Sequence, residues 1–113
     1  MTVHVERDGR VTIITLDRPE RRNAIDHSTL LELLDAQADI ADRAPTETRA
    51  VVLTGAAPAF SAGADLNGVE AGQFATDLRR VLVGFGALPV PVIAAIDGPA
   101  LGAGTQLAIA CDL

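Results

Sequence analysis

Near the start of the chain, β-branched residues are grouped in two runs that are typical of β-strands. Residues 2–7 and 10–16 carry these runs, and the Asp8-Gly9 pair between them is typical of a two-residue hairpin turn. Pro19 stops the second run, and the polar residues after it indicate a loop. The pattern therefore predicts a β-hairpin followed by a loop.

Apolar positions next recur at helical spacing. Asp26 or Ser28 is a suitable N-cap for this helix, and Thr29 and Glu32 stand in the relation of a capping box. The spacing predicts an amphipathic helix. Its apolar positions are Leu30, Leu33, Leu34 and Ala41.

Two short apolar runs follow, with a second helical pattern between them. Residues 50–54 and 92–96 have the composition of strands buried in a parallel sheet, and a loop of small residues follows each run. The helical positions between the runs are Phe74, Leu78, Val81, Leu82 and Phe85. The order of hairpin, helix, strand, loop, helix, strand, loop and helix start predicts a layered α/β architecture. Both loops lie at carboxyl ends of strands, where α/β folds bind ligands.

The composition and charge of the chain argue against several classes of function. The 113 residues suit one small domain, and the net charge of −6 offers no basic surface for a nucleic acid. Cys111 is the single cysteine, which excludes an internal disulfide, and no charged-then-apolar leader opens the chain. No apolar run has the length of a membrane-spanning helix. We therefore expect a cytoplasmic protein with an aliphatic core.

The common nucleotide, nucleophile and zinc motifs do not fit the sequence. No Gly-Lys pair follows a glycine loop, and Leu107 occupies the third glycine position of a dinucleotide-binding fingerprint. Ala59 breaks the nucleophile elbow around Ser61, so we do not expect this serine to act as a nucleophile. His4 and His27 have no partners at ligand spacing, and a structural or solvated role is expected for both.

Backbone amides remain as the candidate chemical groups. A glycine-rich turn that enters a helix points unpaired N–H groups outward, and these groups stabilise an anion or a carbonyl oxygen that gains charge. Two such turns can share one oxygen. The alternative for a single turn is that it only packs a strand against a helix.

Three segments carry a resemblance to a known family. Residues 59–66, AFSAGADL, and residues 91–113, PVIAAIDGPALGAGTQLAIACDL, resemble the two signature segments of the enoyl-CoA hydratase/isomerase (crotonase) superfamily. Residues 16–26, LDRPERRNAID, are similar to the family's first loop. The resemblance implies a crotonase-like α/β fold, which is a superhelix of repeated strand-strand-helix turns. Residues 1–113 would form a single partial domain, the amino-terminal portion, with both oxyanion-hole loops.

The resemblance also implies a ligand and a site. An acyl-CoA thioester, such as an enoyl-CoA, would place its carbonyl oxygen between the backbone N–H groups of Ala64 and Ala103. The family usually has glycine at the position of Ala103, whose methyl group narrows the approach. Asp65 could equally be a helix N-cap, and Asn67 stands where some members offer a cation to the CoA phosphates. No metal or further cofactor is implied. The expected CoA-binding residues are Ala62, Ala64, Asp65 and Leu66.

Gln106 stands where the hydratases of this family have a catalytic glutamate, and their second glutamate would lie beyond Leu113. An amide has no titratable proton near neutral pH, and the loss of a general acid or base typically costs about a hundredfold to ten-thousandfold in rate. Two interpretations stay open. The chain belongs either to a hydratase or isomerase with a changed mechanism or to a non-catalytic acyl-CoA binder, in which Gln106 is a neutral side chain satisfied within the core.

The length of the chain adds a third interpretation. The sequence ends at Leu113, where the repeating pattern of the family calls for a further strand. We therefore expect an inactive truncated fragment, or one piece that needs a complementary carboxyl-terminal chain. The resemblance implies a homotrimer or hexamer for a full-length protein that acts in fatty-acid metabolism. The acyl length is left open.

Overall fold

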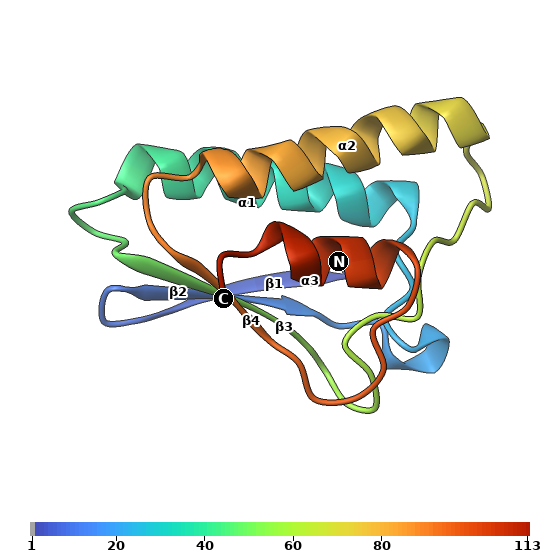
Figure 1. The fold of residues 1–113 in the computed structure, drawn as a ribbon, viewed down its shortest axis with the longest axis horizontal. Coiled ribbons are helices and arrows are strands. Elements are labelled where there is room, and N and C mark those ends of the chain that lie inside the picture. Colours follow the sequence, from blue (N-terminus) through green and yellow to red (C-terminus); the bar gives the residue numbers. More distant parts are fainter. Residues whose placement is uncertain (1) are drawn as a thin grey trace.

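A four-stranded β-sheet forms one layer of the protein, and the helices cover one of its faces (Figure 1). The structure is a computed structural model that describes residues 2–113. The strands lie in the order of the sequence, with the first pair antiparallel and the others parallel. The strands are β1 (Val3–Asp8), β2 (Val11–Leu16), β3 (Ala50–Gly55) and β4 (Val92–Ala95). The helices are the short 3₁₀ helix η1 (Pro19–Arg21), α1 (His27–Arg43), α2 (Ala71–Ala87) and α3 (Ala103–Ala110).

The predicted hairpin is confirmed, with its turn one residue later than the sequence suggested. Asp8 pairs with Val11, so the two turn residues are Gly9 and Arg10. Gly9 has a φ of 61°, a left-handed conformation that glycine adopts without a steric penalty. Strand β2 then alternates buried and half-buried side chains, as a strand under a helical layer should.

Helix α1 begins at its predicted cap, but the predicted capping box is wrong. Asp26 accepts a hydrogen bond from the backbone N–H of Thr29 at 2.8 Å, and the Thr29 hydroxyl donates to the same carboxylate oxygen. The Glu32 carboxylate instead accepts from the backbone N–H groups of Thr2 and Val3, both at 3.1 Å. Glu32 therefore fastens the start of the sheet to α1, a long-range role that local spacing does not reveal.

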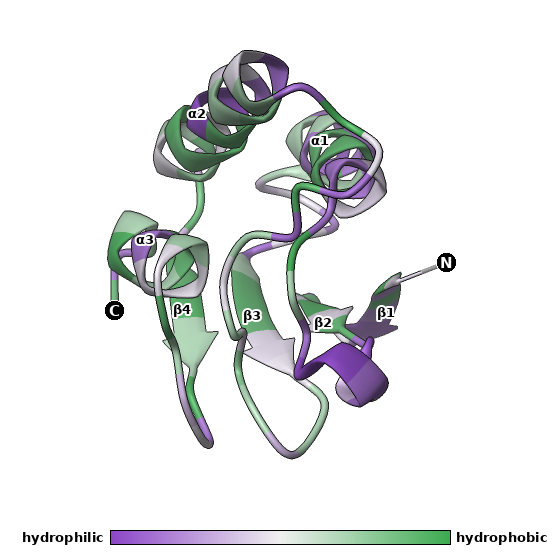
Figure 2. Cartoon of the chain, turned by 90° about the vertical axis from the view of Figure 1, so that its right-hand side faces the viewer, coloured by the Kyte–Doolittle hydropathy of each residue, from purple (hydrophilic) through white to green (hydrophobic). Residues whose placement is uncertain are grey.

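The core lies between the helices and the sheet. Figure 2 shows β3 and β4 as mainly hydrophobic and η1 as strongly hydrophilic. Ala41, predicted on the apolar face of α1, is exposed, and Ile40 is fully buried instead. Strand β4 is less buried than predicted, because it lies at the edge of the described sheet and its last residue, Ala95, is exposed. The largest fully buried side chains are Ile14, Leu16, Ile25, Leu30, Leu33, Ile40, Val51, Leu53, Phe60, Val81, Phe85 and Leu107.

The predicted structural or solvated role of the two histidines is confirmed. His4 lies on the exposed side of β1, with its Nε2 2.9 Å from the Asp17 carboxylate. His27, at the start of α1, has its Nε2 2.6 Å from the Asp77 carboxylate of α2. Because Asp77 is almost fully buried, this contact ties the two outer helices together.

Acid is expected to destabilise the protein through Asp77. Hydrogen bonds from the side chains of Gln73, His27 and Arg80 lower the pKa of Asp77 from 3.8 to about 2. A carboxyl group whose pKa is lower in the folded state stabilises the fold fully above its unfolded pKa, and this contribution is lost as the pH falls through the folded pKa. We therefore expect the free energy of unfolding to fall between about pH 4 and pH 2.

Urea denaturation of the wild type and of Asp77→Asn across this pH range is the measurement. The substitution keeps the size of the side chain and removes its titration, so the pH dependence should flatten. An identical pH dependence in both proteins would show that other carboxyl groups cause the acid sensitivity.

Candidate active site

Two loops meet at the carboxyl ends of β3 and β4, where the sequence placed its candidate chemistry. Figure 1 shows the loop after β3 beside the loop after β4. Ser61 and Ala100 form a parallel bridge between the loops. The Leu101 N–H donates to the Ser61 carbonyl at 3.0 Å, and the Phe60 N–H donates to the Pro99 carbonyl at 3.0 Å. These hydrogen bonds hold both loops as one unit.

Glycines let the two loops approach this closely. A Cβ atom on Gly104 would lie 2.5 Å from the Ser61 carbonyl oxygen, which is far inside contact distance. Gly63 has a φ of 114°, and a Cβ atom there would lie 3.9 Å from the Ala103 nitrogen. Residue 63 therefore lies close to the first residue of α3, and Ala64, which follows it in the chain, lies near Ala103.

Gly104→Ala is expected to separate the loops and to destabilise the protein by about 1–3 kcal/mol, the usual cost of overpacking. The new methyl group meets the carbonyl oxygen and the Cβ atom of Ser61, and a change of side-chain rotamer moves neither atom away. Gly86→Ala is the matched control, because a Cβ atom on that helical glycine has nothing within 4 Å. The control should keep or slightly raise the stability. Urea denaturation of both variants measures the difference, and equal stabilities would contradict the close contact.

The backbone of Ala64 has a free N–H group with a defined direction. Ala64 forms a parallel bridge with Ile25, in which the Ile25 N–H donates to the Gly63 carbonyl and the Asp65 N–H donates to the Ile25 carbonyl, both at 2.7 Å. Since these flanking groups face Ile25, the N–H of Ala64 itself points to the opposite side. Within residues 2–113 it has no hydrogen-bond acceptor.

The N–H group of Ala103 is free for a different reason. Ala103 is the first residue of α3, and the preceding cap residue, Gly102, has no side chain to accept from it. The next N–H, of Gly104, already donates to the Leu101 carbonyl at 2.8 Å. In the described part of the chain the Ala103 N–H meets no acceptor. The first N–H groups of a helix also carry the positive end of its dipole, which favours a partial negative charge beside them.

The other predicted CoA-binding residues are mostly exposed, but some of their N–H groups already donate to other parts of the chain. Ala62, Ala64 and Leu66 are exposed along the 62–66 segment, as is Asn67 after it. The Ala62 N–H, however, donates to the Arg22 carbonyl at 2.9 Å, and the Asp65 N–H is occupied by Ile25. The main-chain donors of this segment that have no acceptor within residues 2–113 are therefore the N–H groups of Ala64 and Leu66.

The prediction that Asp65 caps a helix is wrong. Helix α2 begins six residues later, and its cap is Glu70, whose carboxylate accepts from the N–H groups of Gly72 and Gln73. The Asp65 carboxylate accepts from the Asn67 N–H at 3.1 Å and from the Arg18 guanidinium at 3.0 Å. The hydrogen bond from Asn67, followed by that from Arg18, lowers the pKa of Asp65.

Gln106 is exposed on α3, one turn after Ala103. Its backbone N–H donates to the Gly102 carbonyl at 3.1 Å and so belongs to the first turn of the helix. The interpretation of Gln106 as a side chain satisfied within the core is wrong for this structure. The side-chain amide of Gln106 makes no hydrogen bond within residues 2–113, and it has no titratable proton near neutral pH.

Asn23 was not predicted from the sequence, although its side chain holds the start of the loop that carries Ala64. Asn23 is buried in a left-handed conformation with a φ of 58°. Its amide group donates to the carbonyls of Ala56 and Ala59 at 2.7 and 2.6 Å, while its side-chain oxygen accepts from the Arg18 N–H at 2.7 Å. No local pattern marks this asparagine, since one asparagine in a polar loop is ordinary. Its tolerance of left-handed backbone was the one available signal.

Ser61 is also structural. Its side chain is fully buried, and its hydroxyl donates to the Asn23 carbonyl at 2.8 Å. The expectation that Ser61 is not a nucleophile is confirmed, because the oxygen is neither exposed nor paired with a base. Among residues 2–113, no group of three or more His, Cys, Asp or Glu side chains could hold a metal ion. In the same part of the chain, each helix is too short or too polar to cross a membrane.

Comparisons with known proteins agree on one family. The profile of the family described as Enoyl-CoA hydratase/isomerase matches residues 6–113. A probable enoyl-CoA hydratase of Mycobacterium leprae is 49% identical over 112 residues, covering 91% of this chain and 42% of the relative. A probable enoyl-CoA hydratase of Mycobacterium tuberculosis is 46% identical over 104 residues, with the same coverage of 91% and 42%.

Solved structures give the same result. The crystal structure of an enoyl-CoA hydratase from Bacillus anthracis superposes with a TM-score of 0.90 at 37% identity, covering 100% of this chain and 46% of that one. An enoyl-CoA hydratase from Mycobacterium smegmatis gives a TM-score of 0.91 at 35% identity, with coverage of 100% and 46%. The chain thus spans less than half the length of the relatives that it matches.

Proposed function

Because this chain belongs to the enoyl-CoA hydratase/isomerase family, we propose that it binds acyl-CoA thioesters, enoyl-CoA among them, in fatty-acid metabolism. The predicted crotonase-like α/β fold is confirmed over the matched residues, which correspond to an amino-terminal portion of that fold. One observation carries the proposal. Two backbone N–H groups without acceptors in residues 2–113, those of Ala64 and Ala103, belong to loops that contact each other directly.

The thioester carbonyl oxygen would accept from both N–H groups. Hydrogen bonds aimed at this oxygen draw electrons from the thioester and stabilise the negative charge that develops there during addition or proton transfer at the acyl chain. A single donor of this kind is typically worth roughly 3 kcal/mol in the transition state. Both donors are main-chain groups, so the effect depends on loop geometry and not on any titratable side chain.

The exposed 62–66 segment would lie along the CoA moiety. Ala62, Ala64 and Leu66 offer a surface of small and apolar side chains. Asp65 would contribute only through its main-chain carbonyl, because Arg18 occupies its carboxylate and Ile25 accepts from its N–H. Asn67 offers a neutral amide at the position where some family members have a cationic side chain that would pair with the CoA phosphates. The CoA thioester is the proposed ligand, with no further cofactor.

The side chain at position 106 determines whether this part of the protein can transfer a proton to or from a bound ligand. Its exposed amide, on the helix that begins with Ala103, can orient a water molecule or the ligand by hydrogen bonding but cannot take a proton. We therefore propose binding and polarisation of the thioester as the function supported by these residues. A hydratase or isomerase reaction needs an acid or base from elsewhere in the protein.

Calorimetric titration of the purified protein with crotonyl-CoA tests the proposal, with the absorbance of the conjugated thioester followed in the same sample. Binding with unchanged absorbance supports a non-catalytic acyl-CoA binder or carrier. Binding with loss of the conjugated signal identifies a hydratase whose proton transfer does not rely on Gln106. The absence of binding would overturn the proposal for this chain.

The assembly and the compartment are part of the same proposal. Leu101 and Ile109 are 57% and 75% exposed, and these exposed apolar side chains support contact with a further polypeptide segment. A homotrimer or hexamer, or a complementary carboxyl-terminal chain, would provide one, and analytical ultracentrifugation distinguishes these assemblies from a monomer. A cytoplasmic location is supported by the single cysteine, which forms no internal disulfide.

A further inference from the structure

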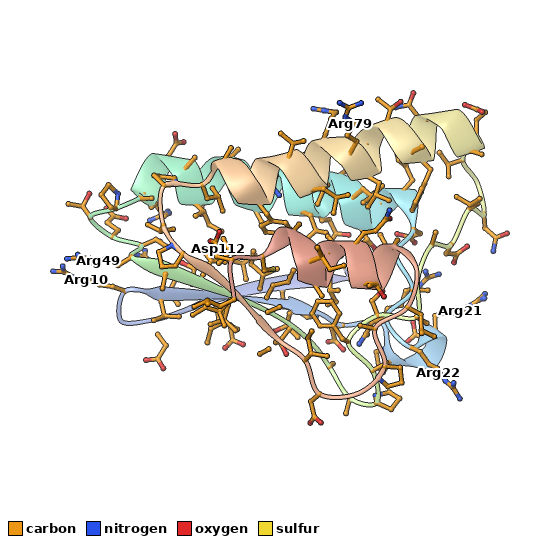
Figure 3. The ribbon with its side chains drawn as sticks, viewed as in Figure 1. Arg10, Arg21, Arg22, Arg49, Arg79 and Asp112 are labelled. Atoms are coloured by element: carbon orange, nitrogen blue, oxygen red, sulfur yellow. The ribbon has the colours of Figure 1, made fainter. Side chains whose placement is uncertain are left out.

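Arg18 lies at the junction of three chain segments around the candidate site. Its Nη1 atom is 3.0 Å from the Asp65 carboxylate and 3.5 Å from the Asp26 carboxylate, and it donates to the Ala24 carbonyl at 3.4 Å. The side chain is 19% exposed, and that of Asp65 is 10% exposed. By contrast, Arg21 and Arg22 point away from the molecule (Figure 3). One guanidinium of this loop is therefore turned inward and shared among several acceptors.

The groups that Arg18 contacts flank one bridge in the backbone. Ala24 and Asp26 are the neighbours of Ile25, and Asp65 follows Ala64. The parallel bridge between Ile25 and Ala64 is the contact that turns the Ala64 N–H outward. The Arg18 guanidinium thus contacts both segments of the bridge. It binds the first segment at Ala24 and Asp26 and the second segment at Asp65.

Arg18 is itself held in place by its backbone. Its N–H donates to the side-chain oxygen of the buried Asn23 at 2.7 Å. Arg18 therefore projects from a fixed point at the end of β2. All three contacts are made by Nη1, whose two N–H donors are fixed in the rigid plane of the guanidinium, whereas the ammonium of a lysine is a point charge on a flexible stem.

We propose that Arg18 is a positioning residue that sets the direction of the Ala64 N–H group by clamping the Ile25–Ala64 bridge through Asp65, Asp26 and Ala24. The inference rests on the proposed function for its consequence, since the aligned N–H is the group that would meet the thioester oxygen. The clamp itself is a property of the protein without ligand. It can therefore be tested in two separate stages.

Hydrogen exchange in the ligand-free protein is the first stage. The amides of Ile25 and Asp65 make the two hydrogen bonds of the bridge. In Arg18→Met both should exchange faster by about tenfold or more, the factor expected when a hydrogen bond to a charged group is lost. Arg18→Lys should give an intermediate rate. Unchanged exchange at both amides in Arg18→Met overturns the inference, whatever the protein binds.

Arg43→Met is the matched control. Arg43 also contacts two carboxylates, those of Asp39 and Glu47, but it lies at the other end of α1. Its replacement should leave exchange at Ile25 and Asp65 unchanged. Asp65→Asn keeps an acceptor for the Asn67 N–H while removing the charge, and it should give part of the effect of Arg18→Met, because the contacts of Arg18 with Asp26 and Ala24 remain. The double variant should exchange no faster than Arg18→Met alone, because the contact that Asp65→Asn weakens is already absent there. Equal acceleration in Arg43→Met would overturn the inference in favour of a general loss of stability.

The second stage uses the ligand. Hydrogen bonding lowers the stretching frequency of a carbonyl group, so difference infrared spectra of crotonyl-CoA with a ¹³C-labelled thioester carbonyl report its polarisation. We expect a lowered frequency in the wild type and in Arg43→Met, and a smaller shift in Arg18→Met. An equal shift in all three proteins overturns the positioning role. Faster exchange in Arg18→Met, with no shift even in the wild type, supports the clamp and refutes the proposed thioester site.

Discussion

Ala103→Pro is expected to lower the affinity for crotonyl-CoA by roughly thirtyfold, or about 2 kcal/mol, the typical cost of leaving a buried acceptor without a donor. Proline removes the N–H of residue 103 and nothing else that the fold uses, since this N–H meets no acceptor within residues 2–113. The first position of a helix is also where proline is tolerated best. Gly102, with φ 50° and ψ −120°, lies outside the α region that a following proline disfavours.

Ala71→Pro is the matched control for this experiment. Ala71 is the first residue of α2, and its cap, Glu70, accepts from the N–H groups of Gly72 and Gln73 and not from that of Ala71. The same substitution at the same helical position should therefore leave the affinity unchanged. Calorimetric titration with crotonyl-CoA and with free CoA makes the comparison, because free CoA has no thioester carbonyl. If Ala103→Pro and Ala71→Pro bind crotonyl-CoA equally well, the Ala103 N–H is not a ligand donor.

Asn23→Ala is expected to destabilise the protein by roughly 3–5 kcal/mol, as the change removes three hydrogen bonds and leaves buried carbonyl groups unsatisfied. The carbonyls belong to Ala56 and Ala59, which begin the loop that carries Ala64. Asn23→Gly should cost about 1 kcal/mol less than Asn23→Ala, because glycine adopts the left-handed φ of 58° without strain. The difference between the two variants separates backbone strain from lost hydrogen bonds.

Urea denaturation of both variants measures these effects. Asn67→Ala is the control, since Asn67 is exposed and a surface substitution usually changes stability by less than about 0.5 kcal/mol. If Asn23→Ala proves as stable as this control, the hydrogen bonds of Asn23 do not hold the loop.

Elements with strong local patterns could be predicted from the sequence alone. The hairpin, the helix from Asp26, the two parallel strands and the second helix all appear where the spacing of apolar residues placed them. These predictions succeeded because a strand and a helix repeat their apolar positions with different periods. The errors were small and had local causes, such as the turn at Gly9 and Arg10 and the exposed Ala41.

Contacts between distant residues could not be predicted in this way. Glu32 was assigned to a capping box and instead binds the start of β1, while Asp65 was a candidate cap and instead binds Arg18. In each case the local sequence offered the carboxylate a partner nearby, but in the folded protein the carboxylate binds a residue that is distant in the sequence. Asn23 and Arg18 lie in the family-like loop of residues 16–26, but no pattern there indicated their partners, which lie as many as 36 and 47 residues away.

The sequence by itself determined the α/β class, the family and the chemistry available at the site, which consists of backbone amides on glycine loops with a glutamine in place of an acid. These properties follow from residue types and their spacing along the chain. Only the tertiary structure decided which amides are free and which way they point. The N–H of Ala64 is free because the hydrogen bonds of Ile25 go to the neighbouring residues, Gly63 and Asp65. The N–H of Ala103 is free because Ala103 is the first residue of a helix. A hydrogen bond depends on the direction of its donor, and for these amides the packing of distant segments sets that direction.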